Sequence, residues 1–431
     1  MIKNIINTFV TKVLAAIFNL VIAIIISNYI GPEGKGQQGL IITTISLIII
    51  ISSIIGPGGL SFLLPRYNLY YLIIPSYIWS VFIITAFGFL IPFLKIVPAG
   101  YLTHVCILSV ILSVSNIHNS ILLSSQQIFK SNLVYTIQIL TLLIVLFVLM
   151  VLLGLHSLNA YIIALYCSYF LSFLIGFYFC KEHFINNFFR FSINRILFGF
   201  RKLFKYGFYN QLDIIAQLLS FRLSYYILNN SIGEAEVGIY SNGVSIIESI
   251  WLISRSIGLV LHARIVNSRD KNYSFKLTLS FIKFSFIASF IVLLPLVFIP
   301  SQFYQFIFGQ QFGYISKVIL SLSPGVLFFS VSFIISYYFS GIGKHYINSI
   351  ASIVGLIVTI ATTLIFIPAF GIIGAGISAS ISYFVTTIIK IVYFVKKQNI
   401  RFLDIFPDKT DFIVLRDVLL NINNKKFFGK K

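Results

Sequence analysis

The chain has 431 residues, of which 58% are apolar and only 10% are charged, and its mean hydropathy is +0.98. Because soluble domains carry about 25% charged residues, this composition excludes a soluble globular protein, a disordered chain and a coiled coil. The alternation of apolar and polar residues that marks outer-membrane barrel strands is not sustained anywhere in the sequence. The sequence therefore predicts an all-α integral membrane protein, in which each crossing needs roughly 20 apolar residues.

We expect about twelve transmembrane helices. Their approximate ranges are 8–30, 38–64, 71–94, 99–124, 132–153, 158–180, 206–228, 237–263, 277–300, 314–342, 346–368 and 371–395. A basic segment divides them into six and six. This division predicts an N-terminal lobe (1–190), a basic cytoplasmic linker (191–205), a C-terminal lobe (206–395) and a cytoplasmic tail (396–431).

The distribution of the 31 Lys and Arg residues predicts how the chain is oriented. With a cytoplasmic N-terminus, 23 of them fall in inside segments, three in outside loops and five within spans. Because basic residues collect on the cytoplasmic side of membrane proteins, we expect both termini to be cytoplasmic. This placement explains the net charge of +20 without nucleic acid as a partner, and it makes membrane lipids the expected contact.

A short motif recurs in both halves of the chain. Segments 30–36 (IGPEGKG) and 232–238 (IGEAEVG) both read I-G-x-x-x-x-G and are 202 residues apart. Since each copy follows the first span of its half, we expect two parallel structural repeats. Locally, the glycines indicate a tight turn between paired helices.

Four ionisable residues lie inside spans 7 and 8, where a charge is costly and marks a candidate functional site. Span 7 holds Asp213 and Arg222, and span 8 holds Glu248 and Arg255. At about 1.5 Å per residue, Asp213 and Arg255 share the inner half of the membrane, whereas Arg222 and Glu248 share the outer half. Two interpretations stay open. In the first, the four residues form salt bridges between the helices. In the second, the arginines bind an anionic headgroup in a cavity, and the acids serve as coupling or ion-pair residues.

Further polar residues lie within the spans. Asn210 and Gln217 flank Asp213 on one stripe of span 7, His262 lies toward the inner end of span 8, and His118 belongs to a polar cluster in span 4. Hydrogen bonds between helices explain such residues, and so does a polar cavity. We treat Asn210, Gln217, His262 and His118 as candidate cavity residues.

Three lysines fall within spans as well. Lys12, Lys283 and Lys390 lie near the cytoplasmic ends of spans 1, 9 and 12. Their long side chains are expected to reach the lipid headgroups. Lys12 is in addition a candidate for binding a substrate headgroup.

Span 2 contains a sequence that breaks helices. Gly56, Pro57, Gly58 and Gly59 follow one another near its inner end. Proline removes a backbone donor and glycine adds freedom, so the four residues predict a kink. They form a candidate hinge, with a static bend as the alternative.

Motifs of covalent chemistry are missing from the sequence. GPEGKG lacks the Walker A spacing, and no HExxH, Cys/His metal cluster or Ser-His-Asp set on a soluble domain is present. Cys106, Cys167 and Cys180 lie in apolar runs and indicate small buried side chains. We therefore expect no enzyme activity, no metal and no cofactor, and movement of a substrate across the membrane is favoured.

Five stretches, in order along the whole chain, carry a family likeness. They are NYIGPEGKGQQG (28–39), IIGPGGLSFLLPRY (54–67), VGIYSNGVSIIESIWLISRSIG (237–258), FGQQFGYISKVILSLSPG (308–325) and IPAFGIIGAGISASISY (367–383). The chain resembles the polysaccharide transporters, or O-antigen flippases, of the multidrug/oligosaccharidyl-lipid/polysaccharide (MOP) export superfamily. The resemblance implies two six-helix lobes in a V shape, as in transporters of the MATE type.

The resemblance also implies a function and its setting. It suggests alternating access that flips an undecaprenyl-pyrophosphate-linked oligosaccharide, such as an O-antigen or other surface polysaccharide unit, across the bacterial inner membrane. A polysaccharide polymerase or a chain-length regulator is the protein partner it suggests. The alternatives are a multidrug or lipid II transporter of the same superfamily and a non-transport membrane enzyme of polysaccharide biosynthesis.

The family pattern bears on the charged residues of span 7. Family members often carry Arg-x-Asp there; Arg222 matches, but Ser224 stands in place of the acid. Asp213 and Glu248 are then the remaining acids. A pyrophosphate needs cations in a low-dielectric cavity, and Arg222, Arg255 and Lys12 are the candidates for binding it.

Overall fold

The computed structural model describes residues 2–94, 96–185, 192–268 and 270–396, and all regular secondary structure in these ranges is helical. The main helices are α1 (Ile2–Ser52), α2 (Pro57–Leu63), α3 (Leu69–Leu94), α4 (Leu102–Ser124), α5 (Ile128–Phe147), α6 (Leu158–Ile185), α7 (Ile193–Ser231), α8 (Glu234–Glu248), α9 (Trp251–Val266), α10 (Lys271–Phe298), α11 (Ser301–Phe308), α12 (Ile315–Gly341) and α13 (His345–Lys396). Short 3-10 helices cover Ser53–Ile55 and Gln310–Phe312, and a π-helical turn covers Val148–Leu152.

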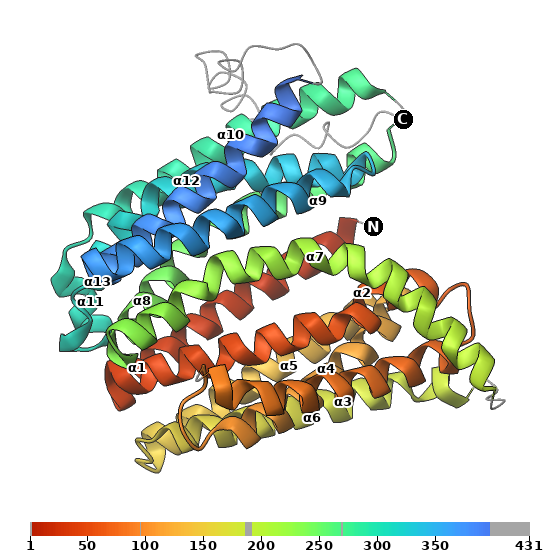
Figure 1. Cartoon of the computed structure of the whole chain (residues 1–431), viewed down its shortest axis with the longest axis horizontal. Coiled ribbons are helices and arrows are strands. Elements are labelled where there is room, and N and C mark those ends of the chain that lie inside the picture. Colours follow the sequence, from red (N-terminus) through yellow and green to blue (C-terminus); the bar gives the residue numbers. More distant parts are fainter. Residues whose placement is uncertain (1, 95, 186–191, 269, 397–431) are drawn as a thin grey trace.

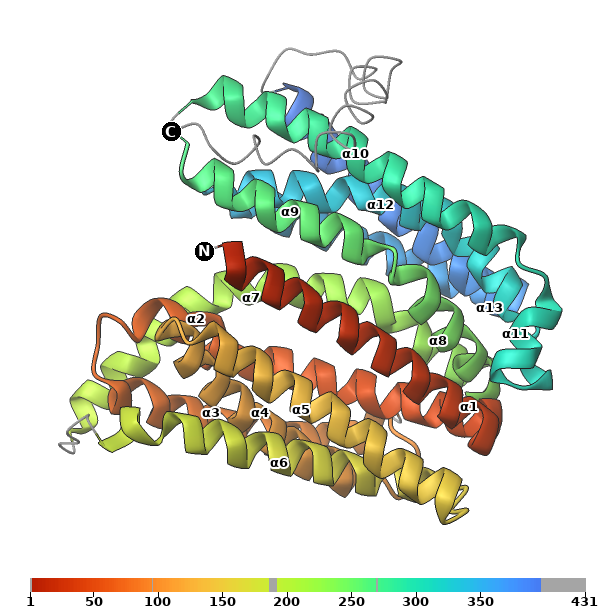
Figure 2. The ribbon, with the colours of Figure 1, turned by 180° about the vertical axis from the view of Figure 1, so that it is seen from behind.

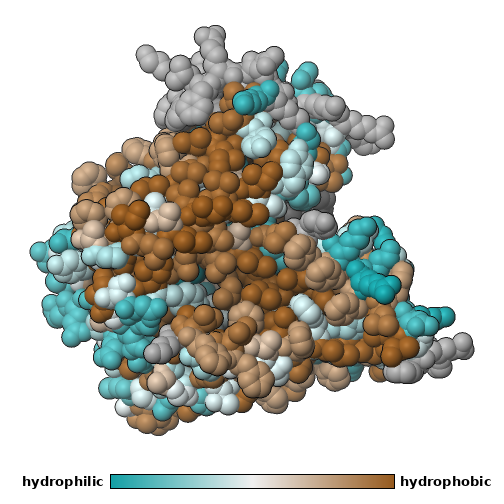
Figure 3. All heavy atoms as spheres, viewed as in Figure 1, coloured by the Kyte–Doolittle hydropathy of each residue, from teal (hydrophilic) through white to brown (hydrophobic). Residues whose placement is uncertain are grey.

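Length and apolar composition make this a membrane protein. Within the described ranges, eight helices are long and apolar enough to cross a bilayer, and the bent pair α8 and α9 adds a ninth span if counted as one. Apolar side chains cover most of the face shown in Figure 3, and hydrophilic ones gather toward its ends. Helices satisfy their own backbone hydrogen bonds, which lipid cannot do, so an all-helical bundle suits this solvent.

Two of the helices are much longer than one crossing. The apolar segment Asn7–Leu63 has 57 residues and α13 has 52. Each contains one glycine with non-helical backbone angles: Gly31 in α1 (φ 70°, ψ −171°) and Gly371 in α13 (φ 57°, ψ −132°). Positive φ strains residues with a Cβ, so these glycines let each helix turn back on itself. Each long helix is thus two helices joined at a glycine.

The helices form two groups. Figures 1 and 2 show α1–α6 packed together on one side and α9–α13 on the other, with α7 and α8 between them. The groups lie together at the end that holds the turns of α1 and α13, and they diverge toward the end where α1 begins. We call the first of these the closed end. The described part of the chain thus has a V-like arrangement.

Helix α7 connects the two groups. Its first half packs against α2 and α3, and its second half packs against α13. A Cβ at Gly199 would overlap the carbonyl oxygen of Tyr71, and one at Gly207 would overlap that of Ile54. The segment expected as a linker is therefore helical from Ile193 onward and lies against the N-terminal group of helices.

The two copies of the I-G-x-x-x-x-G motif meet at the closed end. A Cβ at Gly36 would overlap the carbonyl oxygen of Glu234, and one at Gly238 would overlap that of Pro32. The backbones of α1 and α8 therefore touch without intervening side chains. The first glycine of each copy, Gly31 (φ 70°) or Gly233 (φ 133°), has the positive φ that its turn requires.

Side-chain hydrogen bonds surround this glycine contact. Asn242 Nδ2 donates to Ser27 Oγ at 2.7 Å, and Gln37 Nε2 donates to Glu234 Oε2 at 2.7 Å. Asn28 Nδ2 donates to the carbonyl oxygen of Ile307 in α11, also at 2.7 Å. The closed end is thus held by close backbone packing and by polar contacts that cross between the groups.

The predicted break in span 2 is present. Helix α1 ends at Ser52, a 3-10 turn follows, and α2 begins at Pro57 after Gly56, whose backbone is extended (φ −179°, ψ −133°). Pro57 occupies the first helical turn, where its missing N–H needs no partner. After the break, α2 packs against the first half of α7, where Gly59 lies close to the backbone of Leu203.

We predict that the glycine contact stabilises the closed end. Gly36→Ala and Gly238→Ala should each lower the free energy of unfolding by about 1–3 kcal/mol, because the added methyl group meets backbone that cannot move freely. Gly39→Ala is the control: its Cβ would lie 3.6 Å from Ser241 Cβ, an ordinary contact, and alanine favours helix. Unfolding of the purified variants in detergent measures this, and an equal loss in all three would contradict it.

Candidate functional site

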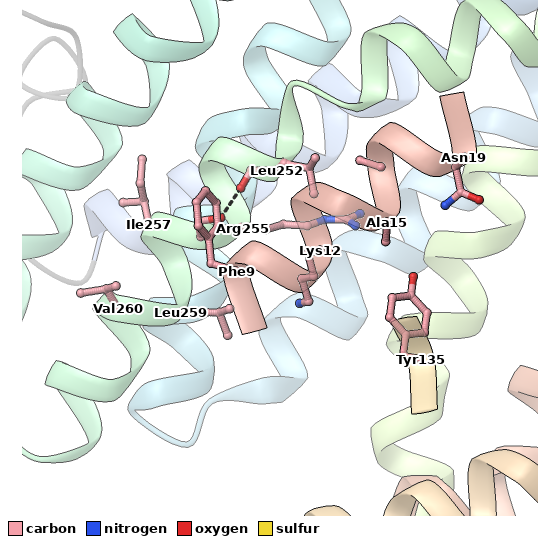
Figure 4. Close-up of a pocket in the computed structure, with 12 residues that line it drawn as sticks. Phe9, Lys12, Ala15, Asn19, Tyr135, Leu252, Arg255, Ile257, Leu259 and Val260 are labelled. Carbon is pink, nitrogen blue, oxygen red and sulfur yellow. Dashed lines mark hydrogen bonds between the residues drawn. The ribbon is translucent and has the colours of Figure 1, made fainter. Parts of the chain in front are cut away.

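A cavity of about 550 Å³ lies between α1 and α9, with Tyr135 of α5 at its edge. Figure 4 shows Lys12 and Arg255 entering this space from opposite helices. Asn19 and Ser256 add polar groups, and the remaining wall is apolar, including Phe9 and Leu259. The cavity therefore combines two cations with surface that suits a lipid.

The break between α8 and α9 positions Arg255. The two helices meet at an angle of 42°, and α9 begins at Trp251. Trp251 is 1% exposed, and its Nε1 donates to the carbonyl oxygen of Val326 in α12 at 3.0 Å. Arg255 follows one turn later, with its guanidinium carbon 4.8 Å from the ring centroid of Phe333. The buried tryptophan thus fixes the helix face from which Arg255 extends.

Lys12 and Arg255 are cations without a carboxylate partner in the described ranges. The one ion pair within 4.0 Å that the structure gives for these ranges joins Arg222 to Glu248. The depths of Asp213 and Arg255 suggested a second pair, and no such contact is formed. A cation in a low-dielectric cavity attracts an anion strongly when no fixed carboxylate neutralises it. The arrangement is suited to binding an anionic group.

Arg222 and Glu248 form a two-pronged pair between α7 and α8. Arg222 Nη2 lies 2.9 Å from Glu248 Oε2, and Nη1 lies 3.2 Å from Oε1. Tyr383 of α13 donates a third hydrogen bond to Oε1 at 3.3 Å. Side-chain exposures are 25% for Arg222 and 13% for Glu248. In this conformation Arg222 is therefore engaged by protein and is not presented to a ligand.

Lys390 does not reach the lipid headgroups, so the expectation for this residue is wrong. It is 1% exposed, and its Nζ donates to Ser332 Oγ at 3.0 Å and Ser336 Oγ at 2.7 Å, both on α12. Lys390 lies on the side of α13 that faces α12 and not lipid. Its distance from the end of the helix, on which the expectation was based, does not show which side of the helix it occupies. Asp213 lies within electrostatic range of Lys390, and its Oδ1 is buried without a hydrogen bond.

The other candidate cavity residues are not among those that line this cavity. His118 is 1% exposed inside the N-terminal group, where its Nε2 lies 2.8 Å from Tyr77 Oη. His262 follows the cavity-lining part of α9 and lies near Tyr337, with ring centroids 6.2 Å apart. Gln217 is half-buried on α7, and the side chain of Asn210 lies outside the described residues.

His118 illustrates why a buried polar residue does not by itself mark a cavity. Phe173 and Phe177 surround its ring, with centroids 5.6 Å and 5.8 Å away. A histidine with one hydrogen bond among aromatic rings belongs to the packed core. The predicted role for His118 therefore does not fit its position.

The sequence analysis missed three residues at or beside the site. Asn19 and Tyr135 line the cavity, and Tyr383 contacts Glu248. Asn19 lies two turns after Lys12 on the same helix, a spacing that was available as a signal. Tyr135 and Tyr383 come from helices whose packing only the fold reveals. Within the described ranges, no three His, Cys, Asp or Glu residues come together in a way that could hold a metal ion.

Comparisons with known proteins place the chain in a family. The model of the "Polysaccharide biosynthesis protein" family matches residues 1–261, more than half of the chain. The chain is 26% identical over 224 residues to "Uncharacterized membrane protein MJ1068" of Methanocaldococcus jannaschii, covering 50% of this chain and 44% of that protein. It is 21% identical over 206 residues to "Probable low-salt glycan biosynthesis flippase Agl15" of Haloferax volcanii, covering 47% and 43%. Each match spans less than half of the relative's length.

Solved structures identify the fold. A multidrug resistance MATE family transporter of the MOP superfamily, in an inward-facing conformation, is similar with a TM-score of 0.69 and 15% identity, over 89% of this chain and 94% of that one. The lipid II flippase MurJ, in an inward closed conformation, is similar with a TM-score of 0.67 and 17% identity, over 100% of this chain and 94% of that one. The chain belongs to the Polysaccharide biosynthesis protein family and has the MATE-like fold of the MOP superfamily.

Proposed function

We propose that the protein is a flippase that moves a lipid-linked oligosaccharide across the membrane by alternating access. The observation that carries this proposal is the cavity between the two groups of helices, where Lys12 and Arg255 lie beside apolar walls without a carboxylate partner in the described part of the chain. Membership in a polysaccharide biosynthesis family and the likeness to a protein named as a probable glycan biosynthesis flippase support it.

The chemistry of the substrate fits the cavity. A diphosphate that joins a sugar to a lipid carries two negative charges and is costly to move through hydrocarbon. Lys12 offers a point charge and Arg255 a planar fork, and both bind phosphate oxygens. Phe9 and Leu259 are exposed apolar residues next to these cations. One site can therefore receive the headgroup while the chain of the lipid stays in contact with apolar surface.

The finer identity of the substrate follows the family resemblance. We propose an undecaprenyl-pyrophosphate-linked unit of an O-antigen or another surface polysaccharide, moved across a bacterial inner membrane next to a polymerase or chain-length regulator. Lipid II is the second candidate, supported by the similarity to the MurJ fold. A cationic drug is a poorer substrate, because the free charges in the cavity are positive.

We also propose twelve crossings in two lobes, with residues 191–205 between them. Helices α1 and α13 then count as two crossings each, the pair α8 and α9 as one, and α7 is added to the eight or nine apolar spans. Both termini lie in the cytoplasm, since this orientation puts 23 of the 31 basic residues inside. The cavity then opens toward the cytoplasm and the closed end faces outward.

Removing the cations should abolish transport. Arg255→Ala and Lys12→Ala should each reduce export of the glycan at least tenfold at unchanged protein level, because each removes a charge-assisted contact to phosphate. Arg264→Ala is the matched control, since this arginine lies on the same helix, away from the cavity, and contacts Tyr273. Export is measured by surface glycan in cells that depend on the variant. Normal export by Arg255→Ala would refute the headgroup site.

Reporter fusions test the orientation. Reporters at about residues 190 and 425, both outside the described ranges, should report the cytoplasm, and one at Gly100, in the turn between α3 and α4, should report the opposite side. The reason is the positive charge near the first two positions. An outside location at 190 or 425 would contradict the twelve-span arrangement.

Alternating access requires the closed end to open and close again in each transport cycle. A Cβ at Gly39 would lie 3.6 Å from Ser241 Cβ, a separation that suits a disulfide. With Cys106, Cys167 and Cys180 replaced by serine, Gly39→Cys with Ser241→Cys should crosslink on oxidation and stop export, and reduction should restore it. Each single cysteine variant controls for the substitutions. Full export by the crosslinked protein would rule out movement of α1 against α8.

A further inference from the structure

Not every cation near the cavity is available to a ligand. Lys12 and Arg255 line the cavity; Arg222 does not line it, but it lies close enough to act electrostatically on Arg255. Glu248 neutralises Arg222 through two hydrogen bonds of 2.9 Å and 3.2 Å. Of these three cations Glu248 neutralises one, Arg222, which leaves the charges of Lys12 and Arg255 for a ligand.

The structure holds Glu248 in place from several sides. It is the last residue of α8, immediately before the 42° bend into α9. Tyr383 of α13 donates to its Oε1 at 3.3 Å. The guanidinium carbon of Arg222 lies 5.3 Å from the ring centroid of Tyr225. Because both partners are fixed by other residues, the pair keeps its two-pronged geometry without a ligand.

Several ionisable groups of the described helices act on Glu248. They include Arg222 and Tyr225 on α7, Tyr240 on α8, Arg255 on α9 and Tyr383 on α13. The tyrosines are neutral hydroxyl groups, so among these residues the arginines balance the charge of Glu248. Arg222 is the arginine within 4.0 Å, and Arg255 acts on Glu248 only from farther away.

We propose that Glu248 determines specificity by setting the charge of the substrate site: it withholds Arg222, so that the cavity offers two uncompensated cations to an anionic lipid headgroup. This inference rests on the proposed function and gives Arg222 and Glu248 a role other than direct contact. A third free cation would hold a doubly charged headgroup more tightly and slow its release. A single net cation would hold it too weakly.

The test is a series of variants ordered by charge. Purified full-length protein in nanodiscs is titrated with a sugar-linked polyisoprenyl diphosphate, whose two phosphates carry one negative charge each, and its Kd is measured. Glu248→Gln frees a third cation and should bind about tenfold more tightly, whereas Arg222→Gln leaves an unpaired carboxylate and should bind about tenfold more weakly. The double variant has the parent's charge and should bind like the parent. In cells, Glu248→Gln should export more slowly despite its tighter binding, because a headgroup held by three cations is released more slowly.

A pair that only holds the helices together gives another pattern. Both single variants would then bind more weakly or unfold, because each leaves a buried charge without its partner. The double variant carries the test even if a single variant does not fold, since it leaves no unpaired charge. If the folded double variant loses affinity tenfold, Arg222 itself contacts the headgroup and the proposal is overturned.

The same titration separates this proposal from the proposed function. Arg255→Gln and Lys12→Gln should each weaken binding of the diphosphate lipid. If both retain the parent's affinity, the headgroup site of the flippase is wrong. If they lose affinity while Glu248→Gln and Arg222→Gln fail to shift Kd in opposite directions, the headgroup site stands and the role of Glu248 is overturned.

Discussion

A charge inside a hydrocarbon layer needs compensation, and this constraint organises the interior of the protein. Transfer of an unpaired ion from water to a low-dielectric medium costs far more than one hydrogen bond returns. The structure meets this cost in three ways. Glu248 pairs with Arg222, Lys390 donates to two serines of α12, and Lys12 and Arg255 face a cavity. Of these three arrangements, the third leaves charge that an incoming anion can neutralise, which marks the cavity as the candidate site.

The second constraint is how closely two helices can approach. At Gly36 and Gly238 the backbones of α1 and α8 touch, and no larger residue fits there. In lipid, where the hydrophobic effect between helices is absent, close approach of small residues gives the van der Waals packing that helps to hold helices together. The groups are therefore held firmly at one end, while at the other end their separation leaves room for the cavity. The same motif, repeated 202 residues apart, supplies both sides of this contact.

The sequence predicted the features that depend on composition and local pattern. Apolar runs gave the helices, and Gly56 and Pro57 gave the break before α2. The depths of Arg222 and Glu248 along their helices allowed their pairing as one of two open interpretations, but the same argument also allowed a pair of Asp213 with Arg255 that does not form. It could not predict which face of a helix meets a neighbour and which meets lipid. Lys390 and His118 show the difference, because both are buried in packed helices although one was expected at the headgroups and the other in a cavity. Orientation about the helix axis depends on all the neighbours together, and periodicity alone does not contain it.

The break between α8 and α9 connects the two constraints. Helix α8 is fastened to α1 by the glycine contact, whereas α9 forms a wall of the cavity and carries Arg255. Glu248 is the last residue before the bend, and its partner Arg222 belongs to α7, which packs against the N-terminal group at one end and α13 at the other. A motion that parts α1 from α8 can therefore be taken up at this bend or at the ion pair. We infer that charge and closure are coupled, because Glu248 both pairs with Arg222 and ends α8 at the bend into α9.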